Sequence, residues 1–347
     1  MEQKRARDYG LHVGRLPTGP KNKITDVPGV TVGHCTINTA EHKTGVTVVL
    51  PCEENPFFHK LPAASFVLNG FGKTAGLVQV NELGTLETPI ALTNTLNVGL
   101  VWDALAGYMV DRCAEDGHTL RSVNPVVCEC NDGTLNHIQQ RAVQAEHVLT
   151  AIRSASTDFE EGAVGCGTGT ICHDLKGGVG SASRQIVLDG RTFTLGVLAQ
   201  TNHGCLSDLT VQGKNIGKEL AEQLAAREPD KGSCILIIAT DLPLDSRQLG
   251  RIAKRASVGL ARLGSFIGHG SGEVFLAFST ANPWDSRDKS ALRQGTFFSE
   301  NEMDLPFRAV AECAEEAVLN SMLSAQTAVS RNGKTIYALT ELWSPSN

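Results

Sequence analysis

Aromatic residues are scarce in this sequence, which has three tyrosines and three tryptophans among 347 residues. Proteins that bind single-stranded nucleic acid present aromatic side chains on which bases stack, and binding to a phosphate backbone requires clustered positive charge. The formal net charge is −6, and the Lys and Arg residues are scattered along the chain. We therefore expect no nucleic-acid partner and favour a peptide or another small molecule as the substrate.

Long hydrophobic runs are also missing. The first nine residues carry charges and are not followed by an apolar stretch, so we predict neither a signal peptide nor a membrane anchor, and no membrane partner. The ten cysteines are about 3% of the residues, far fewer than in a disulfide-rich scaffold. Several of them, such as Cys234, lie in apolar runs. This usage indicates reduced, buried thiols in a cytoplasmic protein.

Common catalytic motifs are absent. Gly72-Lys73-Thr74 resembles the end of a phosphate-binding loop, but that motif requires a glycine at position 67, which is Val67 here. The sequence contains neither the Gly-x-Ser-x-Gly nucleophile elbow nor the His-Glu-x-x-His zinc helix. A nucleotide site and a conventional serine-hydrolase triad are therefore not predicted.

Two groups of residues could bind a metal ion. They are Cys128 with Cys130, and the adjacent pair Cys172 and His173. Neither spacing matches a known zinc module, and buried thiols are the simpler interpretation. We predict no metal and no cofactor.

Strand-like and helix-like patterns are intermixed along the chain without a strict βαβ alternation, which favours layered α/β or α+β packing over a Rossmann sheet. Length alone does not decide between one large domain and two. A polar segment at residues 227–232 precedes a buried-looking strand and, on pattern alone, reads as a surface loop. The predicted strands cover residues 30–37, 46–50, 65–68, 90–93, 125–128, 193–199, 234–239 and 274–278, and the predicted helices cover 98–113, 138–152, 212–226, 246–263 and 305–323.

Four segments occur in this order along the chain: Val127-Cys-Glu129-Cys-Asn-Asp-Gly133, Leu198-Ala-Gln-Thr-Asn202-His-Gly204, Gly232-Ser233 with the apolar run after it, and Gly270-Ser271-Gly-Glu273. Together they resemble the DmpA and β-peptidyl aminopeptidase family. The resemblance extends from about Asp8 to about Thr340. It implies a four-layer αββα sandwich and a precursor that cuts itself between Gly232 and Ser233. Residues 1–232 and 233–347 would then form one catalytic domain.

The chemistry expected of Ser233 explains why no histidine base is needed. Because Gly232 has no Cβ, it can adopt a backbone that lets the Ser233 hydroxyl attack the preceding carbonyl. Cleavage would free an α-amino group with a reference pKa of roughly 7.7–8.0, and its neutral form can take the proton from the hydroxyl of the same residue. Without the resemblance, a Gly-Ser turn at the start of a strand would be the simpler interpretation.

Four further residues receive roles from the resemblance. Ser271 and Glu273 are two residues apart, so an extended chain points both side chains to one face, where they would orient the nucleophile's amino group. Asn202 would donate a hydrogen bond to the oxyanion. Glu129 would bind the free ammonium group of the substrate. A turn or an ordinary structural role is the alternative for each residue.

The resemblance implies a self-processing serine aminopeptidase that acts on short peptides, aminoacyl amides and esters. The sequence leaves open whether the substrates are L-α-, β- or D-aminoacyl compounds. The family also forms homo-oligomers, often tetramers of the processed pair. Two kinds of alternative remain. The first is another enzyme of the same fold, either an amide hydrolase of the nylon-oligomer type or an ornithine acetyltransferase, and for both of these Thr would be expected in place of Ser233. The second is an inactive binding protein with the same fold.

Overall fold

The computed structural model describes residues 3–224 and 232–344, and its strands form two large sheets. The first sheet has four strands in the order β1-β2-β5-β6. Its β5 and β6 strands are parallel, whereas β1, β2 and β5 are antiparallel neighbours. The strands are β1 (Thr31–Asn38), β2 (Lys43–Leu50), β5 (Ile90–Asn94) and β6 (Val126–Cys130).

The second sheet has seven strands, six of them in the order β15-β3-β14-β13-β10-β9, with β4 paired to β3. Its two central strands, β13 and β14, are parallel to each other, and each is antiparallel to its outer neighbour. The strands are β3 (His59–Gly70), β4 (Thr85–Leu86), β9 (Val179–Leu188), β10 (Arg191–Asn202), β13 (Ser233–Thr240), β14 (Gly272–Ser279) and β15 (Trp284–Asp285).

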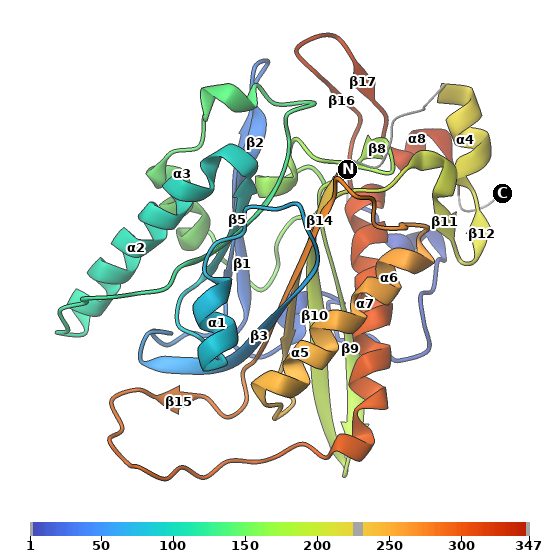
Figure 1. Ribbon diagram of the computed structural model, residues 1–347. Coiled ribbons are helices and arrows are strands. Elements are labelled where there is room, and N and C mark those ends of the chain that lie inside the picture. The colour runs from blue at the N-terminus through green and yellow to red at the C-terminus, as the bar shows by residue number, and fades with distance from the viewer. Residues whose placement is uncertain (1–2, 225–231, 345–347) are drawn as a thin grey trace.

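The two sheets pack face to face, and helices cover both outer faces (Figure 1). In β13, Ile235 and Ile237 pack between the sheets, while Leu236 and Ile238 pack against the helices. Since both faces of this strand are buried, its sequence is a continuous apolar run rather than an alternating one. Burial of each such side chain contributes about 1.5–3 kcal/mol. The layers are helix, sheet, sheet and helix, which confirms the αββα architecture expected from the sequence.

The helices differ from the sequence expectations at several ends. The segment predicted as one helix over 246–263 is divided at Ala256. Where a helix was predicted over 138–152, the α-helix covers residues 145–153. The helix predicted over 212–226 begins at Gly217, and residues 225 and 226 lie outside the described part of the chain. The α-helices are α1 (Leu77–Leu83), α2 (Val98–Glu115), α3 (Ala145–Arg153), α4 (Gly217–Leu224), α5 (Ser246–Arg255), α6 (Ser257–Arg262), α7 (Asp304–Leu323) and α8 (Leu339–Leu342).

Small two-stranded hairpins complete the fold. One of them pairs β7 (Ile171–Cys172) with β8 (Leu175–Lys176). In this hairpin, β7 contacts β10. The other hairpins are β11 (Thr210–Val211) with β12 (Lys214–Asn215) and β16 (Ala328–Val329) with β17 (Thr335–Ile336). In the described residues, no helix combines the length and the apolar character needed to cross a membrane. None of the ten cysteines forms a disulfide, and seven of them are buried.

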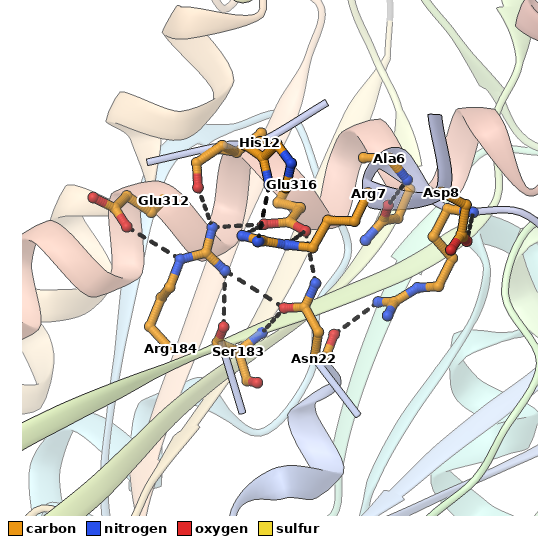
Figure 2. Close-up of polar contacts among 12 residues, drawn as sticks. Ala6, Arg7, Asp8, His12, Asn22, Ser183, Arg184, Glu312 and Glu316 are labelled. Atoms are coloured by element: carbon orange, nitrogen blue, oxygen red, sulfur yellow. Dashed lines mark hydrogen bonds and ion pairs between the residues drawn. The ribbon is translucent and has the colours of Figure 1, made fainter. Parts of the chain in front are cut away.

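The sequence pattern missed β9 because this strand carries a buried charge, Arg184. Figure 2 shows its guanidinium between two carboxylates of α7, with Arg184 Nε 3.1 Å from Glu312 Oε2 and Nη2 2.6 Å from Glu316 Oε2. The Glu316 carboxylate also accepts hydrogen bonds from Arg7 Nε at 2.9 Å and from Asn22 Nδ2 at 2.6 Å. This network joins the N-terminal segment and β9 to α7.

Candidate active site

Strand register brings three of the predicted site residues together. Ser233 is the first residue of β13 and lies opposite Asn202, the last residue of β10. On its other side, Ser233 lies opposite Gly272 of β14, and Ser271 precedes that residue. The three segments meet at one end of the second sheet, although they are far apart in the sequence. Ser233 is only 4% exposed, so its hydroxyl is held in a largely dehydrated environment.

The Gly232–Ser233 junction is tightly packed. The carbonyl oxygen of Gly232 accepts a hydrogen bond from the backbone N–H of Gly272, with N···O at 2.9 Å. A Cβ on residue 232 would lie 1.8 Å from the carbonyl oxygen of Asn202 and 2.7 Å from the Cα of His203. Only glycine fits there without displacing the backbone. The remainder of the polar segment, residues 227–231, lies outside the described residues.

The Asn202 side chain has one defined orientation. Its Oδ1 accepts a hydrogen bond from the backbone N–H of Ile171 at 3.0 Å. Because a backbone N–H can bond only to the oxygen of the amide, this contact distinguishes the oxygen from the nitrogen. The Nδ2 group is therefore available as a donor, which is the chemistry that an oxyanion requires.

The predicted pair of Ser271 and Glu273 is fully buried and in contact. The Ser271 hydroxyl donates to Glu273 Oε1. Glu273 lies opposite Cys234, the residue that follows Ser233, on the neighbouring strand. The segment before β14 is fixed by Asn69, whose Nδ2 donates to the carbonyl oxygens of Gly268 at 3.0 Å and Ser271 at 2.5 Å. Sequence analysis did not single out Asn69.

Glu129 is a buried carboxylate, with 3% exposure, near the end of β6. Its Oε1 accepts from the backbone N–H of Lys73 at 3.0 Å, and its Oε2 accepts from the Thr95 hydroxyl. It takes part in no ion pair with the residues described. A buried carboxylate without a cation nearby is costly, and a positively charged ligand would compensate for that cost. Neither Lys73 nor Thr95 was identified from the sequence.

The next residue along β6 links Glu129 to the junction. Cys130 Sγ donates to the carbonyl oxygen of Ser233 and to that of Gln200, both at 3.5 Å. Burial raises the pKa of Cys130 well above its ordinary value, against the opposing effect of a side-chain hydrogen bond with Ser233. The thiol is therefore protonated and acts as a donor, not as a nucleophile.

A buried lysine supports the loop next to Asn202. Lys176 Nζ donates to the carbonyl oxygens of Gly167, Thr170 and Gly177, at 3.0, 2.9 and 2.7 Å. Burial lowers the pKa of Lys176 to about 7. Three carbonyl acceptors match the three N–H donors of an ammonium group, so the side chain clamps the chain on both sides of β7. A lone lysine in a glycine-rich stretch gave no sign of this role.

Comparison with known proteins identifies the family. The model of peptidase family S58 matches residues 22–336. The β-peptidyl aminopeptidase BapA of Sphingosinicella xenopeptidilytica is 36% identical to the chain over 96% of this chain and 88% of its own length.

Two solved structures agree with this chain over almost its whole length. A protein from Pyrococcus horikoshii OT3 is 45% identical, with a TM-score of 0.92, over 97% of this chain and 96% of its own. The L-aminopeptidase D-Ala-esterase/amidase of Ochrobactrum anthropi, described as a prototype of the serine aminopeptidases and a variant of the Ntn-hydrolase fold, is 35% identical, with a TM-score of 0.89, over 96% and 95% of the two chains. The chain therefore belongs to peptidase family S58 and is a hydrolase of the Ntn-type aminopeptidase class.

Proposed function

We propose that the chain cleaves its own Gly232–Ser233 bond and then uses Ser233 as the nucleophile of a serine aminopeptidase. The observation that carries this proposal is the strand register, which places Ser233 between Asn202 and Gly272 at a buried sheet end. Family membership supports the same reading.

Self-cleavage would begin with attack of Ser233 Oγ on the carbonyl carbon of Gly232. The backbone N–H of Gly272, which bonds to that carbonyl oxygen, would stabilise the negative charge that develops on it. The C–N bond then breaks, the hydroxyl proton passes to the departing nitrogen, and Gly232 is left as an ester on Oγ. Water hydrolyses this ester, which frees the Gly232 carboxylate, the Ser233 hydroxyl and the Ser233 α-amino group.

Substrate hydrolysis would use the new amino group as the base. It takes the proton from Oγ as Oγ attacks the substrate carbonyl, and it returns the proton to the departing amine. Ser271 and Glu273 would orient that amino group, since they form a buried pair on the adjacent strand. Asn202 Nδ2 would donate to the oxyanion. Water then releases the acyl group from Ser233.

Recognition of the substrate's amino end is assigned to Glu129. Its buried carboxylate, which forms no ion pair within residues 3–224 and 232–344, fits an ammonium group, and Lys73 and Thr95 hold the carboxylate in place. We propose short peptides, aminoacyl amides and esters with a free amino end as the substrates, with L-α-, β- and D-aminoacyl groups as the candidates. Names of relatives support this range: one is a β-peptidyl aminopeptidase and another an L-aminopeptidase with D-Ala-esterase/amidase activity.

The two fragments would remain one domain after cleavage. Strands β13 and β14 of the second fragment lie between β10 and β3 of the first, with β10 paired to β13 and β3 paired to β14. The buried ion network in Figure 2 also joins Arg184 of the first fragment to Glu312 and Glu316 of the second. We further propose a cytoplasmic homo-oligomer, such as a tetramer of the processed pairs.

A substrate panel tests this function. Purified protein should release p-nitroaniline from L-, D- or β-aminoacyl-p-nitroanilides, and the Ser233→Ala variant should release none. Hydrolysis by Ser233→Ala at the wild-type rate would overturn the assignment of the nucleophile. The Ser207→Ala variant, altered at an exposed serine outside the site, is the matched control and should retain activity.

A further inference from the structure

Three buried side chains with metal-binding atoms meet beside Asn202. They are Cys172, His173 and His203, and the Cys172 sulfur and one ring nitrogen from each histidine all lie within 4.8 Å of one another. Each residue is no more than 2% exposed. Ligands of a tetrahedral zinc ion lie roughly 2.0–2.3 Å from the metal, so small side-chain rotations would bring these atoms to bonding distance.

The backbone holds the two halves of this cluster together. Cys172 ends β7, and the next two residues, His173 and Asp174, form the turn of the β7–β8 hairpin with left-handed φ values of 50° and 59°. A two-residue hairpin turn of this kind requires positive φ at both positions. The backbone N–H of His173 donates to the carbonyl oxygen of His203 at 2.7 Å. This backbone hydrogen bond therefore links the β7–β8 hairpin to the turn that follows β10.

The His173 ring has the protonation pattern of a metal ligand. Its Nδ1 lies 2.9 Å from the carbonyl oxygen of Cys205. A carbonyl can only accept, so Nδ1 carries the proton and Nε2 carries the lone pair. Metal-binding histidines typically donate their second ring N–H to such a carbonyl. Gly204, with φ of +87°, permits the ring to lie this close, because a Cβ there would be 2.5 Å from His173 Cε1.

The His203 ring gives the second, independent indication. Neither of its ring nitrogens has a hydrogen-bond partner within residues 3–224 and 232–344, although the residue is buried. Its ring lies 5.6 Å from the His173 ring, centroid to centroid, in an edge-on arrangement. A buried imidazole without a partner is unfavourable, and a metal ion would supply the missing interaction.

We propose that Cys172, His173 and His203 form a zinc site, with one sulfur and two imidazole nitrogens as protein ligands and water in the fourth position. Thiolate and imidazole together suit Zn²⁺ among the common divalent ions. On binding, the thiol of Cys172 gives up its proton to solvent and becomes a thiolate, which offsets one of the two positive charges of the ion. The spacing within Cys172-His173 gave no sign of this site, because the third ligand, His203, comes from the turn that follows β10.

The ion would hold in place the turn that follows Asn202, the proposed oxyanion donor, and would take no part in the chemistry of Ser233. His203 follows Asn202 directly, and the hairpin that carries Cys172 also supplies the Ile171 N–H that binds Asn202 Oδ1. A metal that joins the hairpin to the turn thus restrains Asn202 from both sides. This inference does not depend on the proposed nucleophile, and the zinc site can exist in a Ser233→Ala precursor as well.

Metal content tests the proposal directly. Tag-free wild-type protein is incubated with excess zinc chloride and a phosphine reductant, desalted and analysed by mass spectrometry for metals. We expect about one zinc per chain, as for a single site. The variants Cys172→Ser and His203→Gln should lower zinc affinity by more than the roughly 10–100-fold that loss of an outer-shell hydrogen bond costs. Cys52→Ser and His42→Gln, altered outside the cluster, should bind zinc as the wild type does.

A second measurement needs no variant to fold. Cobalt(II) added to the metal-free wild type should give the thiolate-to-cobalt charge-transfer band and the visible spectrum of a tetrahedral ion, and zinc should raise the melting temperature of the wild type. Failure of the wild type to retain zinc, a cobalt spectrum without the thiolate band, or zinc binding by Cys172→Ser equal to that of Cys52→Ser would each overturn the proposal.

Discussion

Replacement of Gly232 by alanine tests the geometry of the junction. The new Cβ would lie 1.8 Å from the carbonyl oxygen of Asn202 and 2.7 Å from the Cα of His203, whereas ordinary contacts are about 3.5 Å or longer. The backbone at residue 232 must therefore move by more than about 1 Å. This movement pulls the Gly232 carbonyl away from the N–H of Gly272, now at 2.9 Å. A misplacement of about 1 Å costs roughly 100-fold in rate, or about 2.7 kcal/mol of barrier.

The assay is a time course of precursor cleavage, followed by denaturing gel and intact mass in freshly synthesised protein. Gly232→Ala should process at least about 100-fold more slowly than the wild type. The matched control is Gly107→Ala, because a Cβ on that helical glycine meets no atom within 4 Å, and this variant should process normally. Cleavage of Gly232→Ala at the wild-type rate would refute the reasoning.

Three further predictions concern single side chains. Glu129→Gln should raise KM for substrates with a free amino end, because it removes the charge that pairs with the ammonium group; an equal loss on N-acetylated substrates would count against this role. Asn202→Ala should lower kcat by about 100- to 1,000-fold with processed enzyme, and an unchanged kcat in steady-state assays would exclude it as the oxyanion donor. Burial raises the pKa of Asp132 from 3.8 to about 6, so between these pH values the folded state holds a proton that the unfolded chain has lost. The contribution of this group to the free energy of unfolding therefore falls by about 3 kcal/mol as pH rises from about 4 to about 6. Urea titrations of the wild type and of Asp132→Asn across this range should therefore differ in slope, with the stability of the wild type changing less favourably as pH rises. Identical slopes in the two proteins would contradict the shift.

Much of the site could be anticipated because its residues lie at strand ends. The alternation of an extended chain predicted that Ser271 and Glu273 share a face, and their side chains are in contact. The apolar run after Ser233 likewise predicted a buried strand, and β13 is buried along its whole length. These inferences needed only local pattern, which a short stretch of sequence carries.

Other parts of the site depend on contacts between distant segments. The Lys73 N–H and the Thr95 hydroxyl reach Glu129 from segments far away in the sequence, and Lys176 donates to three carbonyl groups of the chain around β7. The strand that carries Arg184 was missed because a buried arginine is tolerated only where carboxylates such as Glu316 face it. No local pattern records such partners, since they are brought together only by the fold.

The most direct test of the account is the intact mass of the purified wild-type protein beside that of Ser233→Ala. The account predicts two fragments from the wild-type chain of 37.0 kDa, of about 25 and about 12 kDa in proportion to their lengths, with the smaller fragment beginning at Ser233, and one uncut chain from the variant. A wild-type protein that hydrolyses aminoacyl amides as a single uncut polypeptide would contradict it.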